Sequence, residues 1–320
     1  MATVESISSI RPNFAETQSS DRHQAVGRLG PWQLVRLMHE SEAARVYAAR
    51  PAGVDNQQPA NYVVKMLRKE WWRDAQAIEM QRRAAWLGQK ISHPHLLPVL
   101  SANVQQAPFY FVTPKLAGHS LDVILKQGSL AGRGRLTLPS TLWIVRQVAE
   151  ALATLHEGAG MIHADIKPSN IVVSSDGHAT LIDLGFAHAP SEARHWSSRA
   201  VVGTLSYVAP EVVTSSLAAA PASDLYSLGV ALYELITGKL PFIANAPEEL
   251  VRQHREMKPT CVREYVPKLP KQVASLVHRL LAKDPLRRPE SASAVVEELV
   301  RLEIENFSER VDSGFVVGVA

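Results

Sequence analysis

The residues best equipped for chemistry lie in one polar octet, residues 163–170, which stands between two apolar runs of the sequence. Asp165 can accept a proton, Lys167 can neutralise a phosphate, and Asn170 can bind a hard cation through its amide oxygen. Pro168 fixes its own φ and ends any helix, so the octet is predicted to be a rigid loop that presents side chains. Taken alone, the octet could also be an ordinary turn between two strands.

Composition limits the classes of protein to which the chain can belong. With 320 residues, of which 46% are hydrophobic, it can bury a core and form one or two domains. The net charge of +3 is nearly neutral and the basic residues are scattered, so no nucleic-acid partner is expected. Cys261 is the only cysteine, which excludes a disulfide framework in this chain and fits a reducing cytosol. No apolar run approaches the ~18 residues of a membrane span, and residues 1–10 do not resemble a secretory signal.

Hydrophobic periodicity predicts regular elements on both sides of the octet. Strands are expected at 62–67 and 109–112 and around Val46, and a helix is expected from 71 to 90. Ser140 is expected to cap a long helix that leads into the octet.

Further motifs follow the octet in a fixed order. Asp183 stands in Ile-Asp-Leu-Gly after an apolar strand, Glu211 closes Ala-Pro-Glu, and Asp224 opens an apolar helix. Arg288 lies in Asp-Pro-Leu-Arg-Arg-Pro, further towards the end of the chain. Together with the octet, these motifs resemble the eukaryotic-like (Hanks-type) Ser/Thr protein kinase family over about 31–303.

The resemblance implies an α+β fold with two lobes. A small, β-rich N-lobe with one main helix is expected at 31–116, and a larger, mostly helical C-lobe at 117–303. Residues 1–30 have no apolar period and are expected to form a disordered arm, and residues 304–320 a C-terminal tail.

The resemblance also implies transfer of the ATP γ-phosphoryl group to a Ser or Thr hydroxyl of a protein. Asp165 would orient and deprotonate the hydroxyl, Lys167 would neutralise the transferring group, and Thr204 would contact both residues. Asn170 and Asp183 would hold Mg²⁺, which bridges the phosphates. A lysine two residues after the aspartate is typical of the Ser/Thr kinases.

For the nucleotide, the resemblance implies Lys65 as the group that holds the α- and β-phosphates, because it is the only charge in an apolar strand. A solvent-facing lysine at a strand end is the alternative. The carbonyl of Pro114 and the N–H of Leu116 are implied as the hinge groups that contact adenine.

The turn that would cover the phosphates departs from the family pattern. Its three glycine slots, counted from Val46, hold His39, Ser41 and Ala44. Glycine is used at such places because bare backbone can approach phosphate closely and adopt φ > 0. Side chains at all three slots predict a stiffer turn that stands further from the phosphates. Glu40 and Glu42 are expected to repel phosphate as well, so the predicted grip on ATP is weak.

The helix glutamate that would pair with Lys65 is also displaced. Counted forward from Lys65 and back from His93, its slot falls on Ala84. Glu79 stands five residues earlier and about 140° away around a helix. Either the pairing is lost, or a shifted helix lets Glu79 take it over.

Four residues are implied as structural support of the site: His163, Glu211, Asp224 and Arg288. In the family, Asp224 would hold the backbone of the octet and Arg288 would pair with Glu211. Residues 183–211 resemble the activation segment of the family, with Ser197 and Ser198 in its middle. Ala164 replaces the arginine that usually receives a phosphate on this segment, so phosphorylation there would lack its usual partner.

Two classes of function therefore compete. The first is an active, cytoplasmic Ser/Thr kinase that uses ATP, Mg²⁺ and a protein substrate, and the second is a pseudokinase that binds nucleotide or a partner with little or no turnover. The complete octet and Asp183 favour the first, while the degenerate turn and the displaced glutamate favour the second. A small-molecule phosphotransferase is a third reading, which the Ala-Pro-Glu segment disfavours. The sequence leaves the oligomeric state open.

Overall fold

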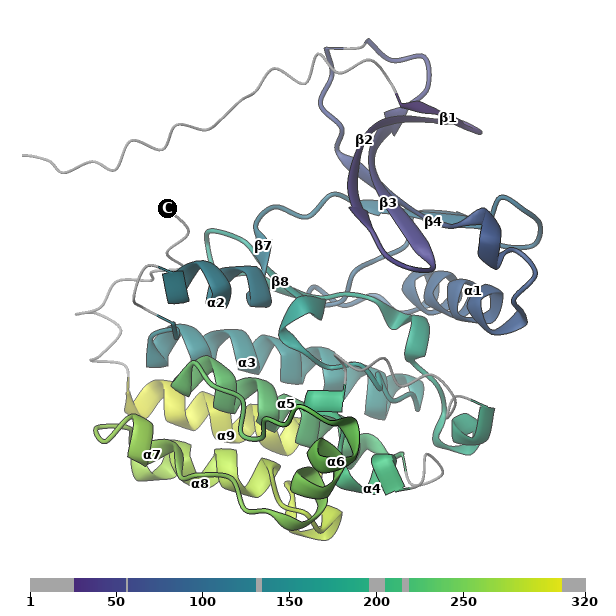
Figure 1. The fold of residues 1–320 in the computed structure, drawn as a ribbon. Helices are drawn as coiled ribbons and strands as arrows, with labels where there is room; N and C mark the ends of the chain where they lie inside the picture. Colours follow the sequence, from purple (N-terminus) through teal and green to yellow (C-terminus); the bar gives the residue numbers. More distant parts are fainter. Residues whose placement is uncertain (1–25, 56, 131–133, 196–204, 215–218, 307–320) are drawn as a thin grey trace, which may run out of the picture.

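The computed structural model describes residues 26–55, 57–130, 134–195, 205–214 and 219–306. The described chain forms a curled β-sheet with one long helix and, below it, a larger body made mostly of helices (Figure 1). After strand β6 (Tyr110–Pro114), the chain passes from the lobe with the sheet to the helical lobe. The α+β fold with two lobes that the sequence predicts is confirmed.

Six antiparallel strands form the sheet of the N-terminal lobe, in the order β1-β2-β3-β4-β6-β5. Besides β6 they are β1 (Gly27–Leu29), β2 (Trp32–Glu40), β3 (Ala44–Pro51), β4 (Tyr62–Leu67) and β5 (Ser101–Asn103). One face carries an apolar cluster formed by Leu34, Tyr47, Val64 and Val112. The strand register sets Lys65 opposite Val46 and opposite Phe111, so these three side chains share the other face.

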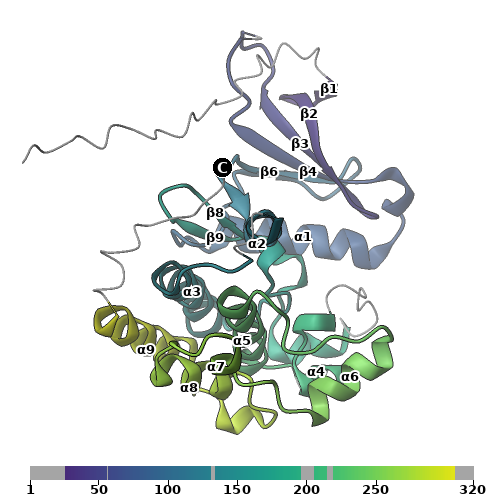
Figure 2. The ribbon, with the colours of Figure 1, turned by 60° about the vertical axis from the view of Figure 1, so that its left-hand side comes forward.

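Helix α1 (Ala75–Lys90) lies beneath the sheet (Figure 2). Asp74 caps it by accepting a hydrogen bond from a backbone N–H three residues further on, at 2.7 Å. On its buried side Ala84 packs against Phe111 of β6. The helix begins four residues later than the sequence predicts, because Lys69–Trp71 form a separate 3₁₀ turn before the cap.

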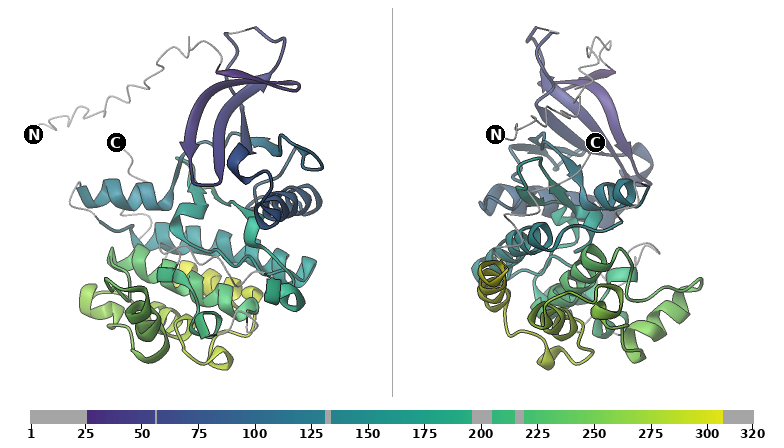
Figure 3. Two further views of the ribbon diagram at one scale, coloured as in Figure 1. Left: turned by 45° about the vertical axis from the view of Figure 1, so that its right-hand side comes forward. Right: turned by 90° about the vertical axis from the view of Figure 1, so that its left-hand side faces the viewer.

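Helices dominate the C-terminal lobe. They are α2 (Leu121–Leu130), α3 (Leu138–Ala153), α4 (Pro210–Thr214), α5 (Pro221–Thr237), α6 (Pro247–Glu256), α7 (Val262–Tyr265), α8 (Lys271–Leu280) and α9 (Ala292–Glu305). Helix α5 is buried on nearly all sides, as its apolar sequence predicts. Helices α3 and α9 lie side by side (Figure 3), and Arg146 of α3 donates to Glu303 of α9 at 2.9 Å.

A small sheet brings the octet and Asp183 together. Its strands are β7 (His119–Ser120), β8 (Ile171–Val173) and β9 (Ala179–Leu181). Strand β8 starts directly after Asn170, and β9 ends two residues before Asp183. Because β8 and β9 pair with Ile171 opposite Leu181, the start of β8 lies beside the end of β9, and this brings Asn170 close to Asp183.

Other boundaries also differ from the sequence predictions. The predicted disordered arm includes residues 27–29, but these form β1 and pair with β2 because the strand next to them offers an edge. Thr137, not Ser140, caps α3: its side chain accepts the Ser140 N–H at 3.3 Å, and Ser140 is buried in the first turn. Helix α9 runs to Glu305, two residues into the predicted tail. In the part of the chain that the structure describes, no helix is both long and apolar enough to cross a membrane.

Candidate active site

Buried Asp224 of α5 anchors the start of the octet. Its Oδ2 accepts the backbone N–H of His163 at 2.7 Å, and its Oδ1 accepts that of Ala164 at 2.9 Å. His156 Nε2 lies 2.8 Å from the same Oδ2. Burial alone would raise the pKa of Asp224, but the contact with His156 and the neighbouring histidines hold that pKa below its usual value. The ionised carboxylate therefore fixes the backbone at the beginning of the octet.

Asp165 is almost fully buried at the centre of the octet, with 6% of its surface exposed. Its Oδ1 lies 2.8 Å from Lys167 Nζ, and its Oδ2 accepts a hydrogen bond from Asn170 Nδ2 at 2.7 Å. His163 ties the octet to the strand end, since its Nε2 lies 3.2 Å from the Ile182 carbonyl. Burial raises the pKa of Asp165, and the charge of Lys167 offsets this only in part. The carboxylate is thus a stronger base than that of an exposed aspartate.

Lys65 and Asp183 connect the two lobes. Lys65 Nζ donates to Asp183 Oδ2 at 2.7 Å, and the centre of the Phe111 ring lies 5.9 Å from the same ammonium group. Burial opposes the ionisation of Asp183, but Lys65 and the Gly185 N–H hold its pKa below the usual value. Lys65 therefore points to the site, and the alternative of a solvent-facing lysine is wrong.

Asn170 and Asp183 offer the donor atoms that Mg²⁺ prefers. Asn170 uses its amide nitrogen on the carbonyl and the carboxylate of Asp165, at 2.8 and 2.7 Å, so its oxygen is the atom left for a cation. Among the described residues, no group of three or more His, Cys, Asp or Glu is placed to hold a metal by itself. Because Mg²⁺ is usually held by one or two protein groups together with substrate phosphates, this sparse donor set fits Mg²⁺ bound with a nucleotide.

Two residues of the site have a left-handed backbone. Ala164 has φ 64° and Asp183 has φ 66°, and they are the only non-glycine residues with positive φ in the described ranges. This conformation costs about 1–2 kcal/mol for a residue with a Cβ atom. Strain of this kind gathers at functional sites, where the surrounding structure holds it in place.

The β2–β3 turn (residues 41–43) is closed by a serine. The Ser41 N–H donates to the Ala44 carbonyl at 2.8 Å, and Ser41 Oγ accepts the Ala44 N–H at 3.1 Å. His39 lies at the end of β2 and Ala44 is buried at the start of β3. The described residues with positive φ do not include any of these positions, so the side chains in the three glycine slots cause no backbone strain.

The same turn is fastened to the segment that follows β4. Trp71 Nε1 donates to the Glu42 carbonyl at 2.9 Å. Arg68 donates its backbone N–H to the Ala43 carbonyl at 2.8 Å and its guanidinium to the Ser41 carbonyl at 3.3 Å. Three consecutive carbonyls of the turn are thus bound by the chain that leads into α1, which links the position of the turn to that of the helix.

Glu40 does not lie on the face of the sheet that carries Lys65. It pairs with Arg45, which stands opposite it on β3, at 2.9 Å. Because successive side chains of a strand point to opposite faces, Glu40 and Arg45 point away from the face of Val46 and Lys65. The expectation that Glu40 would repel a phosphate is therefore wrong, whereas His39, opposite Val46, shares the face of Lys65.

Helix α1 supports Lys65 without a glutamate. Ala84 is buried against the sheet, while Glu79 lies 3.5 Å from Arg83 on the exposed side. No ion pair joins Glu79 to Lys65 in the described structure, so Glu79 does not take over the missing pairing. Gln81, which sequence reasoning missed, donates Nε2 to the Lys65 carbonyl at 2.9 Å. Its spacing of three residues from Ala84, on the same helix face, was the available signal.

The predicted hinge residues follow the strand next to Lys65. Pro114 ends β6 opposite Tyr62 of β4, and Leu116 lies in the loop before β7. Between them, the Lys115 N–H donates to the Asn61 carbonyl at 2.8 Å, which fixes the path of the loop. Contacts of Pro114 and Leu116 with adenine stay predictions.

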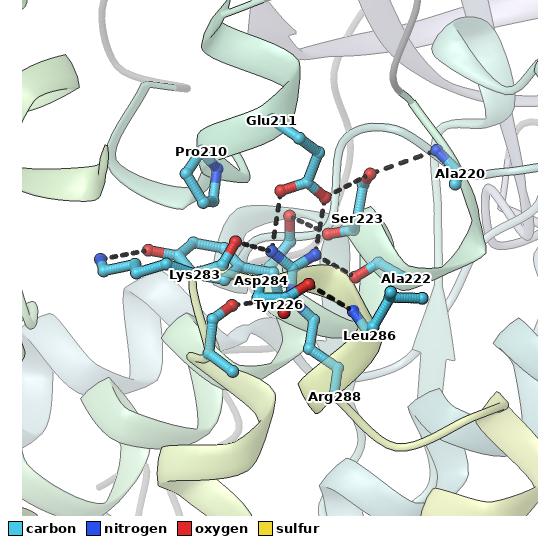
Figure 4. Close-up of polar contacts among 12 residues, drawn as sticks. Pro210, Glu211, Ala220, Ala222, Ser223, Tyr226, Lys283, Asp284, Leu286 and Arg288 are labelled. Atoms are coloured by element: carbon cyan, nitrogen blue, oxygen red, sulfur yellow. Dashed lines mark hydrogen bonds and ion pairs between the residues drawn. The ribbon is translucent and has the colours of Figure 1, made fainter. Parts of the chain in front are cut away.

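The predicted support pair of Glu211 and Arg288 is present (Figure 4). Arg288 Nη1 donates to Glu211 Oε1 at 2.6 Å and Nη2 to Oε2 at 2.7 Å, and Ser223 Oγ donates to Oε1 at 2.8 Å. The guanidinium also lies 4.9 Å from the centre of the Tyr226 ring. Burial would raise the pKa of Glu211, but Arg288 holds it below its usual value. A bidentate pair of this geometry joins α4 firmly to the segment before α9.

The remaining predicted residue, Thr204, lies outside the described residues. The structure therefore brings together five predicted side chains in one place, where the two lobes meet: Lys65, Asp165, Lys167, Asn170 and Asp183.

Residues 42–300 match the sequence model of the protein kinase domain, which is more than half of the chain. The chain belongs to the protein kinase family. This kinase domain is 32% identical over 264 residues to serine/threonine-protein kinase PknA of Mycobacterium tuberculosis, covering 81% of the chain and 58% of that protein. It is 30% identical over 276 residues to the probable serine/threonine-protein kinase pknA2 of Bifidobacterium longum, covering 85% of the chain and 35% of that protein.

A third relative is serine/threonine-protein kinase PrkC of Bacillus subtilis. It is 28% identical over 263 residues, covering 82% of the chain and 39% of that protein. The kinase domain thus corresponds to between 35% and 58% of the length of these three relatives. The similarity identifies the family, and it leaves the activity of this chain to be argued from its own residues.

Proposed function

We propose that this kinase domain transfers the γ-phosphoryl group of ATP to a Ser or Thr hydroxyl of a protein. The observation that carries the proposal is the cluster around buried Asp165, with Lys167 at 2.8 Å and Asn170 at 2.7 Å. Asp183, paired with Lys65, lies beside this cluster. The names of the relatives, all Ser/Thr kinases, support the same substrate class.

In the proposed reaction, the substrate hydroxyl oxygen attacks the γ-phosphorus, the bond to the β–γ bridging oxygen breaks, and ADP leaves. Asp165 accepts the hydroxyl proton, a role that suits its raised pKa. Lys167 offers positive charge to the transferring group. When bound, Mg²⁺ would neutralise phosphate charge, and Asn170 and Asp183 would hold it.

Other residues are proposed to bind the nucleotide or shape the site. Lys65 would hold the α- and β-phosphates, Pro114 and Leu116 would contact adenine, and Thr204 would contact Asp165 and Lys167. His39, Ser41, Ala44 and Val46 would border the phosphates from the β2–β3 hairpin. We further propose a lobe boundary near residue 116 and a cytoplasmic location, which supplies ATP and fits a single cysteine.

A pseudokinase is the second candidate, and one observation favours it. Ala84 occupies the place of an acidic partner for Lys65, whose ammonium pairs with Asp183 instead. A metal–nucleotide complex would have to compete with this pair for Asp183. Such competition would weaken nucleotide binding and slow turnover.

The test is release of ADP from Mg-ATP by the purified wild type beside Asp165→Asn and Asp183→Asn, with phosphate incorporation into the chain and a Ser/Thr peptide followed in parallel. Turnover in the wild type that both variants lose supports a kinase. Calorimetric ATP binding without turnover in the wild type would instead support the pseudokinase. Phosphate transfer that persists in Asp165→Asn would contradict the assigned base.

A further inference from the structure

Arg83 of α1 forms an ion pair with Glu192, which lies 109 residues further along the chain, beyond Asp183. Arg83 Nη1 donates to Glu192 Oε2, and Nη2 lies 3.5 Å from Glu79 Oε1. The Arg83 side chain is 14% exposed and that of Glu192 is 42% exposed. A cavity of about 450 Å³ borders both residues and is also lined by Trp86 and Met161, so solvent reaches the pair.

Glu192 is firmly placed by its own turn. Its backbone N–H donates to the Ala189 carbonyl at 2.9 Å, and its Oε2 accepts the Ala189 N–H at 3.3 Å. Directly before this turn, His188 and Ile162 exchange two backbone hydrogen bonds of 3.0 and 2.9 Å. Because Ile162 is the residue before the octet, Glu192 is connected to the octet through continuous hydrogen-bonded backbone.

Arg83 is equally well connected to the other side of the site. Two residues before it on α1, Gln81 holds the carbonyl of Lys65. The helix also packs against Leu184–Phe186, the short turn after Asp183. The Lys65–Asp183 pair joins β4 to the start of the segment that follows β9, and the Arg83–Glu192 pair joins α1 to a later part of that segment. Because Gln81 links α1 to β4, both pairs hold the N-terminal lobe to this segment.

We propose that Arg83 and Glu192 are positioning residues which hold α1 and the segment after Asp183 together, so that Lys65 and Asp183 stay aligned without an added phosphate. The carboxylate of Glu192 is a permanent negative charge, and α1 supplies its cation. The octet offers no cation at the position before Asp165, since Ala164 has only a methyl group. This inference rests on the proposed kinase function.

The test compares the wild-type chain with Glu192→Gln and with the charge swap Arg83→Glu/Glu192→Arg. Glu79→Gln is the matched control. It also removes a carboxylate beside Arg83, but Glu79 lies on α1 like Arg83 and so does not join α1 to another segment. Glu192→Gln is expected to lower kcat about two- to tenfold with a smaller change in the KM for ATP. The swap should recover at least half of the lost rate, and Glu79→Gln should keep the wild-type rate.

A second measurement does not depend on turnover. Amide hydrogen exchange over residues 75–90 and 184–192 should become faster in Glu192→Gln and at high salt, and should stay unchanged in Glu79→Gln. Equal kcat in Glu192→Gln and the wild type, or a folded swap no faster than Glu192→Gln, would overturn the inference. If the wild type has no turnover, the proposed function fails, and the exchange rates alone decide whether the pair holds the two segments together.

Discussion

The octet and the β2–β3 turn belong to different lobes, and they are held by different kinds of contact. Charged, buried groups fix the octet: Asp224 accepts two of its backbone N–H groups, and Asn170 donates to Asp165. The turn is exposed, and neutral donors from Trp71 and Arg68 hold most of its carbonyls. The octet keeps every side chain that its proposed chemistry needs. The turn lacks the three glycines of the family pattern and is held instead by hydrogen bonds from Trp71 and Arg68.

This difference sets the size of the expected mutational effects. Hydrogen bonds to buried charged groups contribute about 1.5–3 kcal/mol each, and neutral ones about 0.5–1.5 kcal/mol. Changes in the octet, or in Asp224 that holds its backbone, should therefore strongly lower activity or stability. Changes in the turn should alter only the affinity for the nucleotide.

The largest effect is expected for Asp165→Asn, which should lower kcat by about 10²–10⁴-fold because it removes the proton acceptor. The new amide oxygen can still accept the hydrogen bond from Asn170, and burial disfavours the charge of Asp165, as its raised pKa indicates, so the melting temperature should change little. ADP release and thermal unfolding measure the two effects. A variant that loses both activity and fold would show that the octet needs the charge for stability.

Asp224→Asn should lower the free energy of unfolding by about 1.5–3 kcal/mol, because the neutral amide has one acceptor oxygen for the two backbone N–H groups that the ionised carboxylate accepts. Denaturant unfolding measures this loss. Glu305→Gln, at the exposed end of α9, is the control and should be neutral. Equal stability of both variants would mean that the octet is held without Asp224.

Acid should stop the reaction before it unfolds the protein. Asp165 has a pKa raised by burial, so its base form is lost at a higher pH than that of an ordinary aspartate, and kcat/KM should then drop up to tenfold per pH unit. Asp224 has a lowered pKa, so its contribution to stability is present above the unfolded value and is lost only as pH falls below it. Activity and melting temperature recorded from pH 7 to 4 test this order, and a simultaneous fall of both would contradict it.

Trp71→Phe should raise the KM for ATP about two- to tenfold and leave kcat nearly unchanged, because it removes one neutral hydrogen bond to the turn and keeps the ring. Trp72→Phe is the matched control, since its indole donates to the Leu67 carbonyl on β4 and not to the turn. An equal shift in both variants would show that the effect comes from the lobe in general.

The smallest effect concerns the activation segment. Ser197 and Ser198 lie outside the described residues, and Ala164 offers no cation to a phosphate there. Ser197→Ala/Ser198→Ala and phosphatase treatment should therefore change kcat less than about twofold. A tenfold loss, worth ~1.4 kcal/mol in the barrier, would mean that another basic residue receives the phosphate.

The sequence predicted the fold and the central cluster because their signals are local. The octet with its flanking apolar strands and the lone charge of Lys65 in its own apolar strand are each recognised within a stretch of a few residues. Local signals failed where neighbouring residues compete: Thr137 caps α3 in place of Ser140, and α1 begins at Ala75 after a separate turn.

Apart from the contacts that the family resemblance implies, the sequence could not predict those that join distant segments. Gln81 binds the backbone of Lys65, Trp71 binds the β2–β3 turn, and Arg83 meets Glu192 across 109 residues. A glutamine, a tryptophan and an arginine each have many possible partners, so spacing alone does not select one. Only the packing of α1 under the sheet brings these groups within reach of their partners.

Ala164 has one more consequence, for the evolution of regulation in this domain. Its backbone has φ 64°, and its side chain is exposed. The energetic cost of that φ comes from the Cβ atom, which every residue except glycine shares, so a longer side chain adds no backbone strain. We therefore expect that Ala164→Arg alone would offer a cation to a phosphate on the activation segment, with the backbone of the octet unchanged.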